Sequence, residues 1–489
     1  MPGSHVRDRR RRGLGCVRLF AFVLLACLAA ACTGGKEKSG TRPETGTAPL
    51  PTAAAVPPTR AAGDPLGLKW AWGRDDTSPY IRTIREGSTF FEMAWCDVEP
   101  QPGRFDWSRV DGVARSTREF GYVLFLKIRV GSCWVTEGQI GQARGSKRKT
   151  ASAMPKDLGA YQAFVRSVVQ RYSPMGVYEY AIENEPNARN FWVGTAAEYE
   201  RLVTLGAQAI HSANPAAKVV DAGVSSPAYG VAIANRLLQE GRDGEAVSSY
   251  QRYYARRPTS SYRPVSSADE LRSVLASDTA RRSLDFIAAS QRLAAGHVVD
   301  VYQLHFYESW QNVPALLDYL RASLPPSFPV QAWEVGMFWP GGPDDSRLRA
   351  AEVTKAAALL LGSGVRPVIW LPLSPGPGDI RYSLLNDDGS VRPTGIAVQQ
   401  LAAAATGATA QVVDAAGASG VAFTRRGQST MVLWSNGDAT LAAPPGPGAG
   451  AETAGGAPLS WGSGGLHLGT DPVIITVRGK LEDALRLVR

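Results

Sequence analysis

The chain has 489 residues, of which 44% are hydrophobic and 9% aromatic, so it can build a packed core and is too long for one average domain. Its formal charge is +9, but six arginines and one aspartate near the start contribute +5, which leaves +4 (9 − 5) for the rest. The basic run 144–149 has no interleaved aromatic residues, so nothing indicates nucleic-acid binding. Five histidines without a zinc-type cysteine spacing predict no metal, and we expect no other cofactor.

The amino terminus has the pattern of an export signal. An arginine-rich start precedes an apolar stretch, 19–31, that is too short to span a membrane. Residues 28–35 resemble a bacterial lipoprotein box, in which Cys32 would be lipidated after removal of 1–31, although alanine replaces the usual leucine at Ala29. Cys27 is a competing site, and plain secretion is the alternative. We therefore expect a bacterial cell-surface lipoprotein that meets the membrane only through its lipid anchor.

Residues 32–64 are rich in proline, threonine and alanine, which predicts a flexible tether. From 65 to 405, short apolar runs alternate with helical patterns eight times, and this predicts an α/β fold, a (β/α)8 TIM barrel. The expected strands are 66–72, 89–95, 122–130, 177–182, 218–223, 298–306, 328–336 and 367–373.

Two parts of the chain depart from this alternation. Residues 228–266 are rich in arginine, tyrosine and serine, and we interpret them as a rim insertion with one short helix, followed by a single helix over 268–294. Loops on the rim of a barrel shape its substrate groove. From 406 to 489 short alternating strands predict a small C-terminal β-sandwich module.

Two glutamates end predicted strands. Glu185 follows the strand 177–182, which Pro186 stops, and Glu334 lies in the strand 328–336. Because a parallel barrel brings the carboxyl ends of its strands to one mouth, we expect both side chains at the same cavity. Two carboxyl groups facing one cavity suit glycoside hydrolysis, in which one donates a proton and the other acts as nucleophile or base. The pattern alone does not assign the two roles.

Three motifs carry a resemblance to a known family. They are Asn184-Glu185-Pro186, Trp333-Glu334-Val335-Gly336 and the segment 95–107, WCDVEPQPGRFDW. In this order they resemble the retaining glycoside hydrolases of clan A, most closely family 39, with family 5 as a near neighbour. The resemblance covers about 66–405. It implies that Glu185 is the acid/base and Glu334 the nucleophile, with their carboxyl groups about 5 to 5.5 Å apart.

The resemblance also implies substrate-binding residues. Asn184 would bind the sugar 2-hydroxyl, and His305 and Tyr307 would orient the sugar and the nucleophile, with Tyr307 hydrogen-bonded to Glu334. Trp370 could stack on the sugar ring, because aromatic faces bind the apolar face of a pyranose. Its alternative is the barrel core. Further rim candidates, some of which must serve packing only, are Trp70, Trp95, Trp134, Trp192 and Trp339.

Four charged residues near the motifs need separate roles. Glu183 is a rival proton donor, but it precedes Glu185 by two residues and should lie deeper in the barrel. Glu99 belongs to the loop motif and is expected to be structural. Lys127 and Arg129 share one face of the third strand, and either could be the cation beneath Glu334.

Cys96 and Cys133 fall at the ends of consecutive predicted strands, so they should be neighbours on the rim. An exported compartment permits a disulfide between them, and the alternative is two buried thiols.

The sequence thus predicts a monomeric retaining β-glycosidase that hydrolyses O-glycosidic bonds of an extracellular or cell-envelope polysaccharide or oligosaccharide. The alternatives are a non-catalytic carbohydrate-binding barrel lipoprotein and a polysaccharide transglycosylase. Xylosides, glucosides, mannosides and a self-made exopolysaccharide all fit these residues, as do exo and endo action.

Overall fold

The structure, a computed structural model, describes residues 65–69, 77–137, 150–256, 262–337, 344–374 and 380–488. The signal 1–31, the tether 32–64 and the proposed lipidation site Cys32 lie outside the described residues, as do Trp70 and Trp339. Within the described ranges, no helix combines the length and hydrophobicity needed to cross a membrane.

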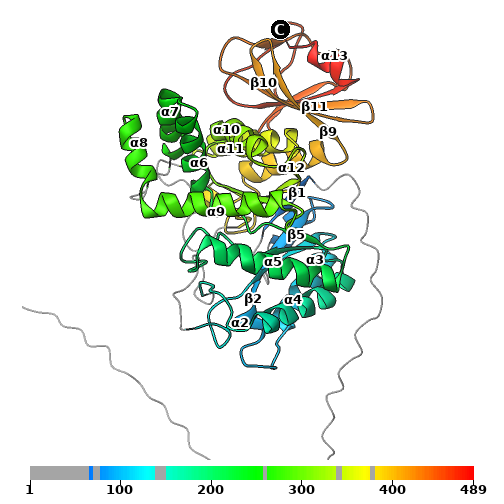
Figure 1. Cartoon of the computed structure of the whole chain (residues 1–489). Helices are drawn as coiled ribbons and strands as arrows, with labels where there is room; N and C mark the ends of the chain where they lie inside the picture. The colour runs from blue at the N-terminus through cyan, green and yellow to red at the C-terminus, as the bar shows by residue number, and fades with distance from the viewer. Residues whose placement is uncertain are drawn as a thin grey trace, which may run out of the picture. The chain divides into compact units, whose positions relative to one another are not determined.

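Eight parallel strands form the central sheet (Figure 1). β8 pairs with β1, and isolated bridges join Val220 to Val301 and Val224 to Leu304 across the β5–β6 edge, so the sheet closes into a barrel. The predicted fold is confirmed. The strands are β1 (Leu66–Leu68), β2 (Ser88–Ala94), β3 (Val123–Arg129), β4 (Glu179–Ile182), β5 (Lys218–Val220), β6 (Tyr302–Phe306), β7 (Val330–Val335) and β8 (Val368–Trp370).

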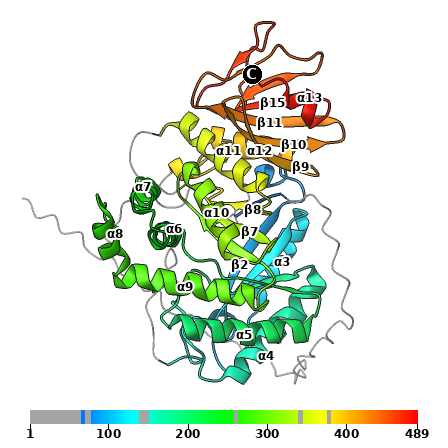
Figure 2. The same cartoon turned by 45° about the horizontal axis from the view of Figure 1, so that its top comes forward.

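Helices surround the sheet (Figure 2). Polar side chains fix where several of these helices begin. Asp157 caps α4 and Thr195 caps α5, each accepting a hydrogen bond from a backbone N–H in the first turn. Apolar residues at helical spacing then face the sheet. The helices up to β8 are α1 (Ser78–Ile81), α2 (Trp95–Val98), α3 (Ser108–Glu119), α4 (Leu158–Tyr172), α5 (Ala196–Ala213), α6 (Pro227–Gln239), α7 (Asp243–Tyr254), α8 (Ala268–Leu275), α9 (Asp278–Ala295), α10 (Val313–Ser323) and α11 (Ser346–Gly362), and α12 (Pro393–Ala405) follows β8.

The region 228–266 is more helical than its composition indicated. It contains most of α6 and all of α7, and Tyr250, Tyr253 and Tyr254 of α7 are buried. Their burial stabilises a helix that the polar sequence around them obscured. The single helix expected over 268–294 is two helices, because the Ser277 hydroxyl accepts from the Ala280 N–H and starts α9 anew.

Side chains from nearly every strand fill the barrel interior. They form one cluster that contains Phe90, Phe125, Ala181, Val220, Val301, Trp333 and Ile369. The Phe125 and Trp333 rings stack with centroids 4.7 Å apart. Since the interior is packed solid, a ligand can enter only at an end of the barrel. Lys127 lies two residues beyond Phe125 on β3, so its side chain faces the same interior one layer closer to the carboxyl end.

The chain after α12 forms a separate antiparallel module. Its five-stranded sheet has the order β13-β15-β11-β10-β9, and β12 pairs with β14 in a two-stranded ribbon; together they make the small β-sandwich. The elements are β9 (Thr409–Ala415), β10 (Ala418–Arg425), β11 (Gln428–Ser435), β12 (Thr440–Leu441), β13 (Gly450–Thr453), β14 (Leu466–His467), β15 (Val473–Arg478) and α13 (Leu481–Leu485). The module packs against α11, where a Cβ on Gly362 would come within 2.8 Å of Val421.

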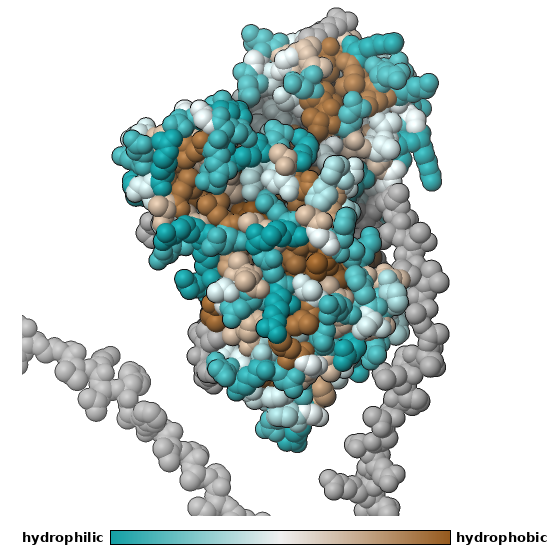
Figure 3. Space-filling model, viewed as in Figure 1, coloured by the Kyte–Doolittle hydropathy of each residue, from teal (hydrophilic) through white to brown (hydrophobic). Residues whose placement is uncertain are grey.

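Large hydrophobic side chains are seldom exposed in the described parts of the chain. Figure 3 shows hydrophobic surface in patches separated by hydrophilic residues. Phe105 and Trp134, which are exposed by 45% and 36%, follow β2 and β3, at the carboxyl end of the barrel. Among the rim tryptophans that the structure describes, Trp134 alone has an accessible ring.

Candidate active site

The backbone after β4 turns sharply to deliver Glu185. Glu183 and Glu185 have φ values of +71° and +41°, in the left-handed region that non-glycine residues seldom adopt. The turn is held because the Glu183 N–H donates to the Ile128 carbonyl and its carboxylate accepts from the Val130 N–H at 2.7 Å. Such conformations persist only where surrounding contacts impose them, and they concentrate at functional sites.

One arginine holds the loop that follows Glu185. Arg282 of α9 donates to four backbone carbonyls, those of Pro186, Asn187, Trp192 and Gly194, at 2.6 to 2.9 Å. A single guanidinium has five donors in a rigid fork, so it can fix several carbonyls at once. Burial lowers the pKa of Arg282 to about 10, so it remains charged at neutral pH. The loop carrying Glu185 is thereby tied to the helical layer.

Glu334 on β7 is held as a carboxylate. Its Oε1 lies 2.6 Å from the Lys127 Nζ, and its Oε2 accepts from the Tyr307 hydroxyl at 2.6 Å. Burial by itself raises the pKa of Glu334, but His305, when protonated, and the Lys127 ammonium outweigh it, and with these hydrogen bonds they hold the pKa well below its usual range. An ionised, oriented carboxylate is what a nucleophile requires.

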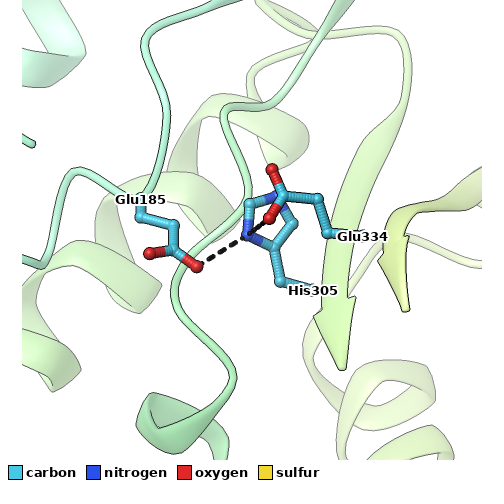
Figure 4. Close-up of side chains that lie close together, drawn as sticks. All are labelled: Glu185, His305 and Glu334. Carbon is cyan, nitrogen blue, oxygen red and sulfur yellow. Dashed lines mark hydrogen bonds and ion pairs between the residues drawn. The ribbon is translucent and has the colours of Figure 1, made fainter. Parts of the chain in front are cut away.

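Glu185 and Glu334 converge on His305 (Figure 4). The His305 Nδ1 lies 3.1 Å from Glu185 Oε1 and 3.7 Å from Glu334 Oε2. One ligand atom of each of the three side chains lies within 4.8 Å of those of the other two. The two carboxyl groups are therefore close enough for the short separation of about 5 to 5.5 Å used in retaining hydrolysis. They are closer than the separation of about 6.5 to 9.5 Å that inverting hydrolysis needs to place a water molecule between them.

These three side chains could in principle bind a metal ion, since imidazole and carboxylates are common ligands. The Lys127 ammonium, however, lies 2.6 Å from Glu334 Oε1 and 3.2 Å from His305 Nε2. It supplies the positive charge at this point and would repel a cation. The donor set fits acid–base and nucleophilic chemistry better than metal binding.

Asn184 lies beside the same lysine. Its side-chain oxygen accepts from the Lys127 Nζ at 2.6 Å, and the residue is buried. Because the carbonyl of the amide faces Lys127, its NH2 group is directed away from the ammonium. A contact between this NH2 group and a sugar 2-hydroxyl stays a prediction.

The two cations of β3 have separate partners. Lys127 contacts Glu334, whereas Arg129 lies 3.5 Å from Glu183 and 3.3 Å from Glu92. Complete burial raises the pKa of Glu183 to about 7 against the opposing effect of Arg129. Glu183 is fully buried, and its carboxylate contacts Arg129 and accepts from the Val130 N–H. It therefore supports the loop, which argues against Glu183 as the proton donor.

Trp95 and Trp370 do not present rings to the cavity, which corrects two expectations. Trp95 is 2% exposed, stacks on Phe164 of α4, and donates its indole N–H to Glu99. Trp370 is 1% exposed and follows Ile369, whose side chain fills the barrel interior. Since strand side chains alternate, Trp370 faces the surrounding helices. Trp192 is also fully buried.

A disulfide joins Cys96 and Cys133, whose Cα atoms are 5.8 Å apart. It links α2, which follows β2, to the loop after β3. Glu99 has the structural role expected of it, because it accepts from the Trp95 indole and from the Gly103 N–H. The Trp134 indole donates to the Glu99 carbonyl, so the exposed Trp134 is fixed on this part of the rim.

Gln303 is a residue of the site that the sequence motifs do not include. It precedes His305 by two residues on β6, and its side-chain oxygen lies 2.8 Å from His305 Nε2. The signal was present, because Gln303, His305 and Tyr307 alternate along one strand and so share a face. A glutamine in such a row is unusual, because glutamine is mostly exposed in proteins.

Two glutamates thus meet at the carboxyl end of an eight-stranded α/β barrel. No protein-family model matches the chain, and no curated protein does. A solved family 39 glycoside hydrolase from the gut symbiont Bacteroides cellulosilyticus WH2 has 15% identity and a TM-score of 0.58, with 86% of this chain and 82% of that chain covered. At this identity the likeness shows the fold alone.

Two further solved structures are similar over nearly their whole length. A monomeric β-xylosidase from Caulobacter crescentus CB15 has 15% identity and a TM-score of 0.51, with 87% of this chain and 98% of that chain covered. The GH39 enzyme from Xanthomonas axonopodis pv. citri has 14% identity and a TM-score of 0.50, with 87% and 96% covered. The chain thus has a family 39-like architecture.

Replacing Lys127 with methionine should move the acidic limb of the pH–rate profile to higher pH. Without the ammonium, Glu334 stays buried beside Glu185, so its pKa rises and it is protonated over more of the acidic range. We expect a shift of about one unit or more and roughly a tenfold loss of kcat/KM below that limb. Rates on an aryl β-glycoside across the pH range provide the measurement. A loss that is equal at every pH would contradict this role.

Proposed function

We propose that this protein is a retaining β-glycosidase that hydrolyses O-glycosidic bonds by double displacement, with Glu185 as acid/base and Glu334 as nucleophile. One observation carries the proposal: the two carboxyl groups approach each other at one site, within 4.8 Å at their ligand atoms, while Lys127 and Tyr307 hold Glu334 in its ionised form. A glycosidic bond needs both groups, since its leaving oxygen must be protonated while its anomeric carbon is attacked.

The proposed reaction has two balanced steps. In the first, Glu334 forms a bond to the anomeric carbon while the bond to the leaving oxygen breaks and that oxygen takes the proton of Glu185. In the second, water attacks the same carbon, gives its proton to Glu185 and releases Glu334. Each step inverts the carbon, so the product retains the β configuration.

The proposed substrate is a polysaccharide or oligosaccharide outside the cell or in its envelope. The export pattern of the first 31 residues and the lipoprotein-like sequence around Cys32 support this location, with secretion without a lipid as the alternative. We expect a monomer. β-Xylosides are the first substrates to test, because the similar Caulobacter protein is described as a β-xylosidase.

The test is hydrolysis of 4-nitrophenyl β-xyloside, β-glucoside and β-mannoside, with proton NMR of the first sugar product. We expect turnover of at least one substrate and initial release of the β anomer. Initial release of the α anomer would overturn the retaining mechanism. Binding of xylan or glucan without any turnover would favour a carbohydrate-binding barrel, and transfer to added acceptor sugars in preference to water would favour a transglycosylase.

A further inference from the structure

Gln303 lies between a backbone carbonyl and the histidine of the site. Its side-chain Nε2 donates to the Asp221 carbonyl at 2.6 Å, and its Oε1 lies 2.8 Å from His305 Nε2. Both Gln303 and His305 are fully buried. Solvent therefore does not supply alternative partners, and the hydrogen bonds among these groups must be mutually consistent.

The chemistry of the two partners fixes the direction of each hydrogen bond. A backbone carbonyl only accepts, so the NH2 group of Gln303 must face Asp221, because the opposite orientation would place two oxygens 2.6 Å apart. The Gln303 oxygen then faces His305 and can only accept. The hydrogen between them must therefore be on His305 Nε2. When the ring is neutral, its Nδ1 is consequently an acceptor.

Neighbouring groups are compatible with this tautomer. Lys127 is 3.2 Å from His305 Nε2, but two of its hydrogens go to Asn184 and Glu334 at 2.6 Å each, so it does not need the ring nitrogen as an acceptor. A Cβ on Gly223 would come within 2.5 Å of His305 Nε2, so only a glycine leaves room for the ring here. These contacts fix the position of the His305 ring as well as its tautomer.

We propose that Gln303 is a positioning residue that keeps the hydrogen of His305 on Nε2, so that His305 Nδ1 and Glu185 share the single proton used in the acid step. This inference rests on the proposed function. The proton lies along the 3.1 Å line between Nδ1 and Glu185 Oε1. Whichever atom holds it, the pair has one proton to give to a leaving oxygen.

The charged groups around the ring favour one shared proton. Glu185 faces Nδ1 from the β4 loop, Glu334 of β7 lies 3.7 Å from Nδ1, and Lys127 of β3 lies near Nε2. The carboxylate of Asp221, after β5, binds Tyr199 and Ser290, so the Asp221 carbonyl is the part that reaches Gln303. The positive charge of Lys127 offsets the negative charge of Glu334. Glu185 and His305 are therefore together uncharged when they share one proton.

Without Gln303, the other tautomer becomes available. His305 could accept from Lys127 at Nε2 and donate from Nδ1 to Glu185, which stabilises Glu185 as a carboxylate and removes the acid. Only substrates whose leaving group needs protonation would be affected. An activated leaving group departs without an acid.

The experiment compares Gln303→Met on phenyl and 2,4-dinitrophenyl β-glycosides of whichever sugar the wild type cleaves. We expect kcat/KM for the phenyl glycoside to fall about tenfold or more, part of the 10² to 10⁴ that a general acid supplies, and that for the dinitrophenyl glycoside to change less than about threefold. Equal losses on both substrates would overturn the proposal.

Gln331→Met is the matched control. Gln331 is a buried glutamine on β7, and its oxygen accepts from the Trp333 indole at 2.6 Å in the barrel core. Gln331→Met should lower the stability of the protein, and any loss of kcat/KM should be the same for both leaving groups. A leaving-group dependence in this control equal to that of Gln303→Met would assign the effect to general loosening of the barrel and overturn the proposal.

A direct measurement covers the case in which Gln303→Met does not fold. Nitrogen-15 NMR of the wild type, with His305 assigned against a His305→Ala variant, reports which ring nitrogen carries the hydrogen. Hydrogen on Nε2, with Nδ1 either bare or sharing the proton of Glu185, supports the proposal, and a neutral ring with hydrogen only on Nδ1 overturns it. This result is independent of turnover, so failure of the proposed hydrolase function would be seen separately.

Discussion

Replacing Glu334 with glutamine should reduce turnover by on the order of 10⁴-fold or more on every glycoside that the wild type cleaves. Glutamine nearly matches glutamate in shape, and its amide oxygen can still accept from Lys127 or Tyr307. An amide oxygen is nevertheless a very poor nucleophile, so no covalent intermediate forms. Activated and unactivated leaving groups should be affected alike, because both need the attack on the anomeric carbon.

The matched control for this loss is Glu179→Gln. Glu179 is also a buried glutamate, but it is the first residue of β4, at the opposite end of the barrel from the site. Its replacement should leave kcat/KM within about threefold of wild type. Steady-state rates of both variants, with thermal unfolding to verify folding, decide the matter. Glu334→Gln with wild-type rates would rule out Glu334 as nucleophile.

Replacing Glu185 with alanine should separate substrates by their leaving groups. Hydrolysis of a phenyl β-glycoside should fall about 10³-fold or more, within the range that general acid–base catalysis supplies. With a 2,4-dinitrophenyl glycoside the first step proceeds without the acid, so the glycosyl–enzyme accumulates and a burst of phenol should be seen. The second step is slow because no base activates water.

Added azide gives a sharper result with Glu185→Ala. The small anion occupies the space that the side chain vacates and needs no base, so it should release the accumulated intermediate as a β-glycosyl azide. NMR of the product determines the configuration. Glu179→Gln again serves as the control and should form no azide adduct. If azide instead gave the α product, Glu185 would lie on the face of the nucleophile and the assigned roles would be reversed.

Most of the barrel could be predicted because its signals are local. Buried parallel strands appear as short apolar runs, and the helices between them repeat apolar residues at helical spacing. The region 228–266 was harder, since α7 is stabilised by buried tyrosines within a polar sequence. The break between α8 and α9 depends on one capping serine, Ser277, which a continuous helical pattern conceals.

The site could be predicted only in part. Glu185 and Glu334 were recognisable because each ends a strand, and barrel topology brings such ends together. The direction in which a side chain near the end of a strand points could not be predicted. Trp95 and Trp370 lie at strand ends as well, yet both are turned into the packing between sheet and helices.

The sequence by itself determined the alternation of strands and helices, the β-rich module after it and the two glutamates, because each is written in a short stretch of residues. Only the tertiary structure decided that Lys127 and not Arg129 meets Glu334, and that Gln303 faces His305. Those choices depend on distances between strands that are far apart along the chain. The physical reason is that an ion pair or hydrogen bond needs contact within about 3 Å, which spacing along a sequence does not encode.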